Sequence, residues 1–103
     1  MSLTPEQKKK YRTIGHVLKP LVIIGENGVS NNVNDEIQRA LFDHELIKIK
    51  ISVGDREDKA LIIKAILQQT RAELVQSIGK TILIIKHNPN AKTKLSNLKR
   101  YSI

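Results

Sequence analysis

A short aliphatic run that ends in a glycine loop constrains the fold of this chain more than any other stretch. Residues 21–24 form the run, and Gly25-Glu26-Asn27-Gly28 interrupts it. Apolar residues then recur every four positions, at Val29, Val33, Ile37 and Leu41. This spacing is typical of an amphipathic helix, whereas a short apolar run bounded by glycine is typical of a strand. The stretch therefore predicts a strand, a loop and a helix in succession.

The loop at residues 25–28 has the features of a phosphate-binding site. Glycine at both ends permits positive φ and removes the Cβ atoms that would hold a ligand away from the backbone. Ser30, or one of the asparagines after it, can cap the helix, so that free N–H groups and the positive end of the helix dipole face one opening. A GxxG sequence here is equally compatible with a simple tight connection. Neither GxGxxG nor GxxxxGK[ST] occurs, which favours the backbone of a polymer over a free nucleotide.

Positive charge is concentrated at the two ends of the sequence. Residues 1–20 carry five basic side chains against one acid, residues 80–103 carry six against none, and the stretch between them carries seven against nine. A pI near 9.9 with clustered cations is typical of a protein that binds a polyanion. Generic solubility is the alternative. An anionic membrane surface is disfavoured because the ends lack the apolar face of an interfacial helix.

The length of 103 residues predicts one domain, and the absence of cysteine excludes a disulfide framework and a thiolate metal site. No apolar run approaches the roughly 20 residues that span a bilayer. No secretion signal opens the chain. We therefore expect a soluble, cytoplasmic protein.

Helical and strand patterns alternate along the chain. The predicted helices cover residues 5–17, 31–42 and 56–69, and the predicted strands cover residues 21–24, 45–53, 74–78 and 81–86. The order αβαβαββ predicts an α/β domain, a two-layer α/β sandwich with a mixed four-stranded sheet. In it, two crossovers should give parallel neighbouring strands before an antiparallel hairpin. We expect residues 1–87 to form this domain and residues 88–103 to form a basic, loosely ordered tail.

The second predicted strand alternates isoleucine with lysine. Ile47, Ile49 and Ile51 would lie on one face, and Lys48 and Lys50 on the other. The lysines either protect an edge strand from aggregation or form a basic strip on an open sheet face.

Five stretches, in their order and spacing, resemble the CRM domain, named for chloroplast RNA splicing and ribosome maturation, in its small stand-alone bacterial form, the YhbY family. They are HVLKP at residues 16–20, IGENGV at 24–29, EI with AL within 36–41, HELIKIKI at 44–51 and VQSIGKT at 75–81. The resemblance covers about residues 3–87. It implies an RNA-binding domain similar in fold to the C-terminal domain of bacterial translation initiation factor 3. It also implies large-subunit ribosomal RNA or a pre-ribosomal particle as partner, and a role in ribosome assembly.

In that family the GxxG loop contacts RNA, so the resemblance places the site at the loop, with Lys19 beside it and the basic first helix as a supplement. The predicted RNA-binding residues are Gly25, Glu26, Asn27, Gly28, Lys19, Lys8, Lys9, Arg12, Lys48, Lys50, Lys80 and Lys86. Two positions depart from the family pattern. The last strand ends in Ile84-Ile85-Lys86 where an aliphatic-Tyr-Arg sequence is common. Glu26 stands where a basic or small polar residue is frequent, and we expect its carboxylate either to point away from the phosphates or to weaken their binding.

Few aromatic side chains are available for base stacking, because the chain has one Phe and two Tyr. This favours recognition of the shape and phosphate positions of folded RNA.

The three histidines are widely separated, and the run Asp43-His44-Glu45 is more typical of a helix end than of a catalytic or metal site. We therefore expect no enzyme activity, cofactor, metal or small-molecule substrate, and a monomer. The alternative is a chromatin or nucleoid protein of the Alba type, which would prefer duplex DNA or bind DNA and RNA alike. A protein-interaction module would require an apolar surface patch.

Overall fold

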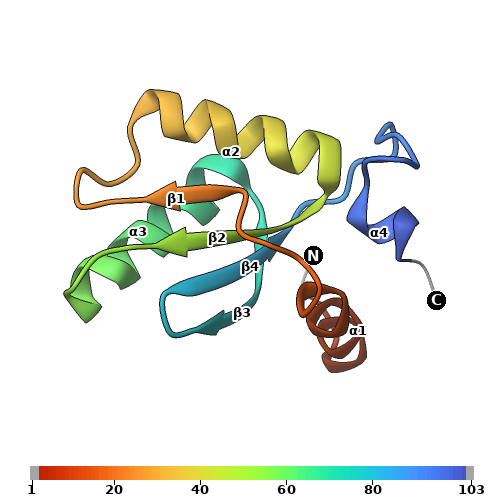
Figure 1. Ribbon diagram of the computed structural model, residues 1–103, viewed down its shortest axis with the longest axis horizontal. Helices are drawn as coiled ribbons and strands as arrows, with labels where there is room; N and C mark the ends of the chain where they lie inside the picture. Colours follow the sequence, from red (N-terminus) through yellow and green to blue (C-terminus); the bar gives the residue numbers. More distant parts are fainter. Residues whose placement is uncertain (1–2, 102–103) are drawn as a thin grey trace.

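The computed structural model describes residues 3–101 of the chain (Figure 1). Its elements are α1 (Pro5–Gly15), β1 (Val22–Ile24), α2 (Asn31–His44), β2 (Leu46–Ile51), α3 (Arg56–Thr70), β3 (Glu73–Ile78), β4 (Thr81–Ile85) and α4 (Asn97–Arg100). The predicted α/β class and the order αβαβαββ are confirmed, and α4 is added at the end. No helix within residues 3–101 combines the length and the apolar character needed to cross a bilayer.

Local side-chain hydrogen bonds explain where the helices begin. The side chain of Thr4 accepts from the N–H of Gln7, and the side chain of Gln7 accepts from the N–H of Thr4, which forms a complete capping box before α1. Ser30 caps α2, and Asp55 caps α3 through the N–H of Glu57. The predicted helix starts are therefore confirmed, while α1 ends two residues earlier than predicted.

The strand order in the sheet is β1-β2-β4-β3. β1 is parallel to β2, and β4 is antiparallel to both β2 and β3. The prediction that both crossovers join neighbouring strands is therefore wrong for the second one, because β4 lies between β2 and β3. Residues 82–85 of β4 are all buried, whereas β3 has exposed residues at its end. A strand that is apolar on both faces is stabilised in the interior of a sheet, so β4 occupies the centre and β3 the edge.

The two faces of the sheet are covered to different extents. On the first face, isoleucines of β2 and β4 pack with Ile37 and Leu41 of α2 and Ile66 of α3. On the second face, α1 supplies Tyr11 and Ile14 to a smaller core. The sheet with α2 and α3 thus forms the predicted two-layer sandwich, and α1 and α4 add a partial third layer (Figure 1).

Part of the second face stays uncovered. Lys50 and Ile23, which are register partners on β2 and β1, are exposed, and Ile23 keeps 66% of its surface accessible. Lys48, two residues before Lys50 on the same face of β2, is half-buried. β2 has a neighbour on each side, so the lysines do not protect an edge strand. Of the two interpretations of the alternating strand, the basic strip on an open face is the one that fits.

Residues 87–101, which we call the C-terminal segment, pack against the domain where a loose tail was expected. The side-chain amide of Asn97 donates to the carbonyl oxygen of Leu46 at 2.6 Å. Leu98 and Tyr101 contact the smaller core of the second face. These contacts come from single polar and apolar side chains without periodicity, which is why the sequence pattern did not predict them.

The close approach of α1 to the sheet depends on Gly15. A Cβ atom at Gly15 would lie 2.6 Å from Cδ2 of Leu83, a side chain of the smaller core that keeps only 2% of its surface exposed. We predict that Gly15→Ala lowers the free energy of unfolding, because overpacking of a core costs about 1–3 kcal/mol. The higher helix propensity of Ala offsets part of this loss. Urea denaturation measures the change. Gly54→Ala is the control, because nothing lies within 4 Å of a Cβ there; equal effects of the two changes would contradict the packing described.

The buried phenol of Tyr11 makes stability depend on alkaline pH. Burial raises the pKa of Tyr11 above its ordinary value of 10.0, and the nearby Glu45 carboxylate raises it further. The neutral phenol therefore contributes stability that is complete below about pH 10 and is lost as the pH rises through the folded-state pKa. We predict that Tyr11→Phe changes stability little at pH 7 and makes the protein more stable than its parent above pH 10. Denaturant unfolding at both pH values tests this, and identical pH profiles would contradict it.

Candidate nucleic-acid interface

Three connections meet at one end of the sheet, which we call the loop end. They are the GENG loop (residues 25–28) after β1, residues 52–54 after β2, and the turn between β3 and β4 (Figure 1). The N–H of Ser52 donates to the carbonyl oxygen of Ile24 at 2.7 Å, and the N–H of Ile51 donates to that of Lys80 at 2.6 Å. These bonds hold the three connections side by side.

The GENG loop is a closed turn with an open outer surface. The N–H of Gly28 donates to the carbonyl oxygen of Gly25 at 3.0 Å, and Gly28 has φ +72°, which favours glycine. A Cβ atom at either glycine would meet nothing within 4 Å. Among residues 3–101 no hydrogen bond engages the N–H of Glu26 or Asn27. These two donors are therefore available to a ligand.

The start of α2 adds further donors beside the loop. Ser30 Oγ accepts from the N–H of Val33 at 3.2 Å, so the predicted capping of α2 is confirmed. The N–H groups of Asn31 and Asn32, in the first turn, have no acceptor within the helix. Together with the positive end of the helix dipole they favour an anion at this place.

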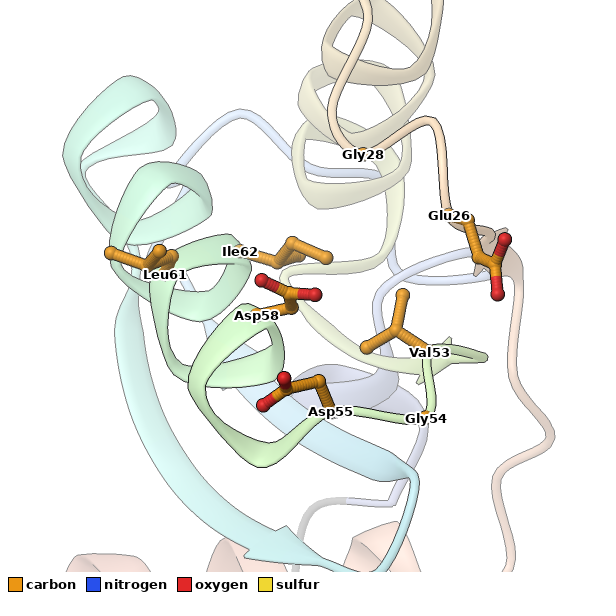
Figure 2. Close-up of a pocket in the computed structure, with 8 residues that line it drawn as sticks. All are labelled: Glu26, Gly28, Val53, Gly54, Asp55, Asp58, Leu61 and Ile62. Atoms are coloured by element: carbon orange, nitrogen blue, oxygen red, sulfur yellow. The ribbon is translucent and has the colours of Figure 1, made fainter.

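An acidic hollow borders the GENG loop on the side of α3 (Figure 2). It has a volume of about 550 Å³, and Glu26, Asp55 and Asp58 contribute carboxylates to its lining, with no basic side chain among the lining residues. Figure 2 shows the carboxylate of Glu26 pointing away from Gly28. Within residues 3–101, no three or more His, Cys, Asp or Glu side chains are grouped to hold a metal ion. The carboxylates make this side of the loop unfavourable for an anion.

Lysines lie on that other side of the loop end. Lys50 is exposed on the uncovered face, next to the end of β2, and Lys80 is exposed in the turn between β3 and β4. Lys59 of α3 donates through Nζ to the carbonyl oxygen of Gly79 and so fixes this turn. The loop end thus combines free N–H donors with cations.

Other predicted residues lie at the opposite end of the sheet, which we call the far end. Lys19 precedes β1 and the GENG loop follows it, so the prediction that Lys19 lies beside the loop is wrong: the strand separates them. Lys86 follows β4 at the far end, and α1 lies nearer to this end than to the loop (Figure 1). The predicted site residues therefore divide in two. Gly25, Glu26, Asn27, Gly28, Lys50 and Lys80 belong to the loop end, and Lys8, Lys9, Arg12, Lys19 and Lys86 to α1 and the far end. Lys48 lies between the two groups, in the middle of β2.

Two residues of the run Asp43-His44-Glu45, namely His44 and Glu45, have a structural role. Nδ1 of His44 donates to the carbonyl oxygen of Leu95 at 2.8 Å. Glu45 keeps only 4% of its surface exposed and accepts hydrogen bonds from the C-terminal segment. The two side chains thus hold the C-terminal segment, a role that sequence reasoning missed because both partners lie more than 40 positions away.

Comparisons with known proteins agree with this architecture. The family model for the CRS1 / YhbY (CRM) domain matches residues 3–86. A "Probable RNA-binding protein" of Pseudomonas aeruginosa is 46% identical over 102 residues, which cover 99% of this chain and 98% of the relative. An "RNA-binding protein" of Haemophilus influenzae is 42% identical over 94 residues, covering 91% of this chain and 95% of the relative.

A solved structure supports the same assignment. The solution structure of a hypothetical protein from Staphylococcus aureus matches with a TM-score of 0.75 and 33% sequence identity, covering 88% of this chain and 95% of the other. The family match spans most of the chain, and the relatives are similar over nearly their whole length. The chain therefore belongs to the CRS1 / YhbY (CRM) domain family.

Proposed function

We propose that this protein binds RNA, and that the GENG loop and the lysines of the loop end hold the RNA backbone. The observation that carries the proposal is the open turn at residues 25–28, whose free N–H groups lie beside the start of α2 and on the same sheet end as Lys50 and Lys80. The names of the relatives, which describe RNA-binding proteins, support the choice of polymer.

The chemistry of the loop end suits a phosphate diester. The N–H groups of Glu26 and Asn27 would donate to phosphate oxygens, and hydrogen bonds to charged groups contribute about 1.5–3 kcal/mol each. The dipole of α2 adds a smaller attraction, about 0.3–1 kcal/mol. Lys50 and Lys80 supply positive charge from the sheet side. The acidic hollow on the opposite side sets the direction of approach, because its carboxylates repel a second phosphate there.

We also propose that the partner is structured large-subunit ribosomal RNA or a pre-ribosomal particle, and that the protein acts as a monomer in ribosome assembly in the cytoplasm. Cations are present at both ends of a molecule that measures 37 × 26 × 25 Å. An RNA that contacts both ends must extend over this length, which fits a folded RNA better than a short single strand. The scarcity of aromatic side chains also favours phosphate contacts over base reading.

The proposal is for a binding protein without catalytic chemistry. The imidazole of His44 is engaged by a backbone carbonyl, and Nδ1 of His87 lies 4.0 Å from the buried Glu45 carboxylate. The carboxylates are the only ionisable groups among the described residues that line the acidic hollow, and no Ser, Cys, Lys or His lies beside them there. We assign no catalytic residue.

Replacing Glu26 and Asn27 together by aspartate tests the role of the loop. Both side chains are exposed, so the fold should be kept, while one net negative charge is added beside the phosphate. We predict that affinity for a folded large-subunit ribosomal RNA fragment falls about tenfold or more, equivalent to about 1.4 kcal/mol. Fluorescence anisotropy measures the affinity.

Gln68→Glu is the matched control, because it adds one negative charge at an exposed position of α3 near the opposite end of that helix from Asp55. It should weaken binding much less than the loop variant does. Undiminished binding by the loop variant, or equal losses in the two variants, would contradict a phosphate site in the GENG loop.

A further inference from the structure

A second hollow lies toward the far end of the sheet, and its charge is opposite to that of the acidic hollow. It has a volume of about 220 Å³, and Lys19, Lys48 and Arg100 are among the residues that line it. No Asp or Glu occurs among its described lining residues. The three cations come from three different parts of the chain: the connection before β1, the strand β2, and α4. We call this hollow the basic groove.

The basic groove also offers apolar and aromatic surface. Val17 and Leu21 line it and keep 63% and 48% of their surfaces exposed. Tyr101 lines it as well, and the guanidinium carbon of Arg100 lies 5.4 Å from the centre of the Tyr101 ring. A simple anion would need only the cations, and a purely apolar ligand would need only the other surfaces. A nucleotide uses both, because its base stacks on aromatic rings or guanidinium planes while its phosphates contact lysine.

We propose that the basic groove binds one unstacked nucleotide of an RNA chain, as a second RNA site separate from the GENG loop. This inference rests on the proposed RNA-binding function and adds a site where a base is contacted. The volume is below the roughly 300–1,000 Å³ of pockets for drug-sized ligands, so it suits a single base with its sugar and phosphates outside. Lys19, one of the lining residues, is exposed and can contact the adjoining RNA backbone.

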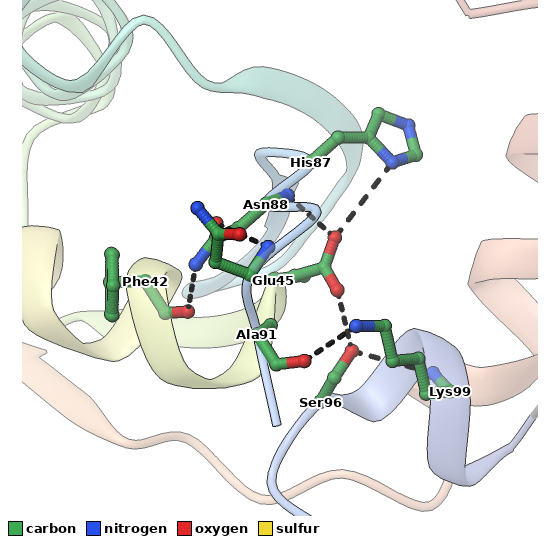
Figure 3. Close-up of polar contacts among 8 residues, drawn as sticks. Phe42, Glu45, His87, Asn88, Ala91, Ser96 and Lys99 are labelled. Carbon is green, nitrogen blue, oxygen red and sulfur yellow. Dashed lines mark hydrogen bonds and ion pairs between the residues drawn. The ribbon is translucent and has the colours of Figure 1, made fainter. Parts of the chain in front are cut away.

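One wall of the basic groove comes from the C-terminal segment, beyond the residues that the family model matches. Buried Glu45 holds this segment in place (Figure 3). One carboxylate oxygen accepts from the N–H of Asn88 at 2.7 Å, and the other accepts from the hydroxyl of Ser96 at 2.8 Å. The side-chain amide of Asn88 donates to the carbonyl oxygen of Phe42 at 2.7 Å.

Two more contacts fix the wall next to the groove itself. Asn97 donates to the carbonyl oxygen of Leu46, and His44 donates to that of Leu95, and both side chains also line the groove. Arg100 and Tyr101 follow directly in α4 and after it. Their side chains are thus presented by a segment that is already ordered, which reduces the entropic cost of binding.

The first test is an NMR titration of the ¹⁵N-labelled protein with a uridine tetranucleotide. We expect the largest chemical-shift changes at the amides of residues 17–19, 21 and 97–101. The same tetranucleotide with abasic sites, and inorganic phosphate alone, should shift these amides much less. Changes confined to residues 25–34 would overturn the basic groove as a nucleotide site and leave the proposed function standing. If neither the tetranucleotide nor a folded ribosomal RNA fragment binds, both the groove and the proposed function are overturned.

The second test compares variants of matched charge. Arg100→Ala should weaken tetranucleotide binding by about fivefold or more, the scale of losing one stacking partner. Lys94→Ala removes the same charge from the same segment but is not a lining residue, and it should weaken binding less than twofold. Tyr101→Phe keeps the ring and should bind like the parent, whereas Tyr101→Ala should not. Equal losses for Arg100→Ala and Lys94→Ala would show only general attraction and overturn the proposal.

Discussion

The alternation of isoleucine and lysine along β2 separates the hydrophobic core of this protein from its charged surface. Ile47, Ile49 and Ile51 are fully buried under α2 and α3, while Lys48 and Lys50 face the side that α1 covers only in part. Because side chains alternate with a period of two, a slip of one residue would bury the lysines and expose the core. The register of β2 with β1 and β4 therefore determines both the stability of the fold and the position of its cations.

The arrangement of charge follows from this register and from the direction of the strands. Parallel pairing of β1 and β2 brings the GENG loop to the same end as Lys50, and the hairpin adds Lys80 there. α3 starts at this end with Asp55 and Asp58, which suit its own dipole and make the neighbouring hollow acidic. At the far end, cations of the first connection, β2 and α4 surround a hollow without carboxylates. The two hollows are opposite in charge, so a polyanion would be attracted to the uncovered sheet face and the basic groove rather than to the acidic hollow.

Features specified by residues close in sequence could be predicted, and features that depend on distant residues could not. The caps Thr4, Ser30 and Asp55 each lie next to the helix they start, and the turn at Gly79-Lys80 joins two adjacent strands. The position of β4 between β2 and β3 depends on which strand is most completely buried, which is a property of the whole sheet. The position of the GENG loop between β1 and α2 could be predicted because its signal is local.

The far-end groove could not be predicted for the same reason. Its first and last lining residues, Val17 and Tyr101, are more than 80 positions apart in the sequence. Arg100 and Tyr101 also belong to a stretch without apolar periodicity. Lys19 was placed beside the loop because it is close to it in sequence, although an intervening strand carries it to the opposite end. Glu45, at φ 61°, is buried, and its partners Asn88 and Ser96 come from the distant C-terminal segment.

The measurement that tests RNA binding most directly is a fluorescence-anisotropy titration of the parent protein at several salt concentrations. A folded large-subunit ribosomal RNA fragment is compared with duplex DNA of equal length. RNA recognition through phosphates predicts a clear preference for the RNA, and a steep fall in affinity with salt, with a log-log slope of about −0.7 to −0.9 for each phosphate neutralised. Equal affinity for the DNA at every salt concentration would contradict RNA recognition and indicate general binding of nucleic acid.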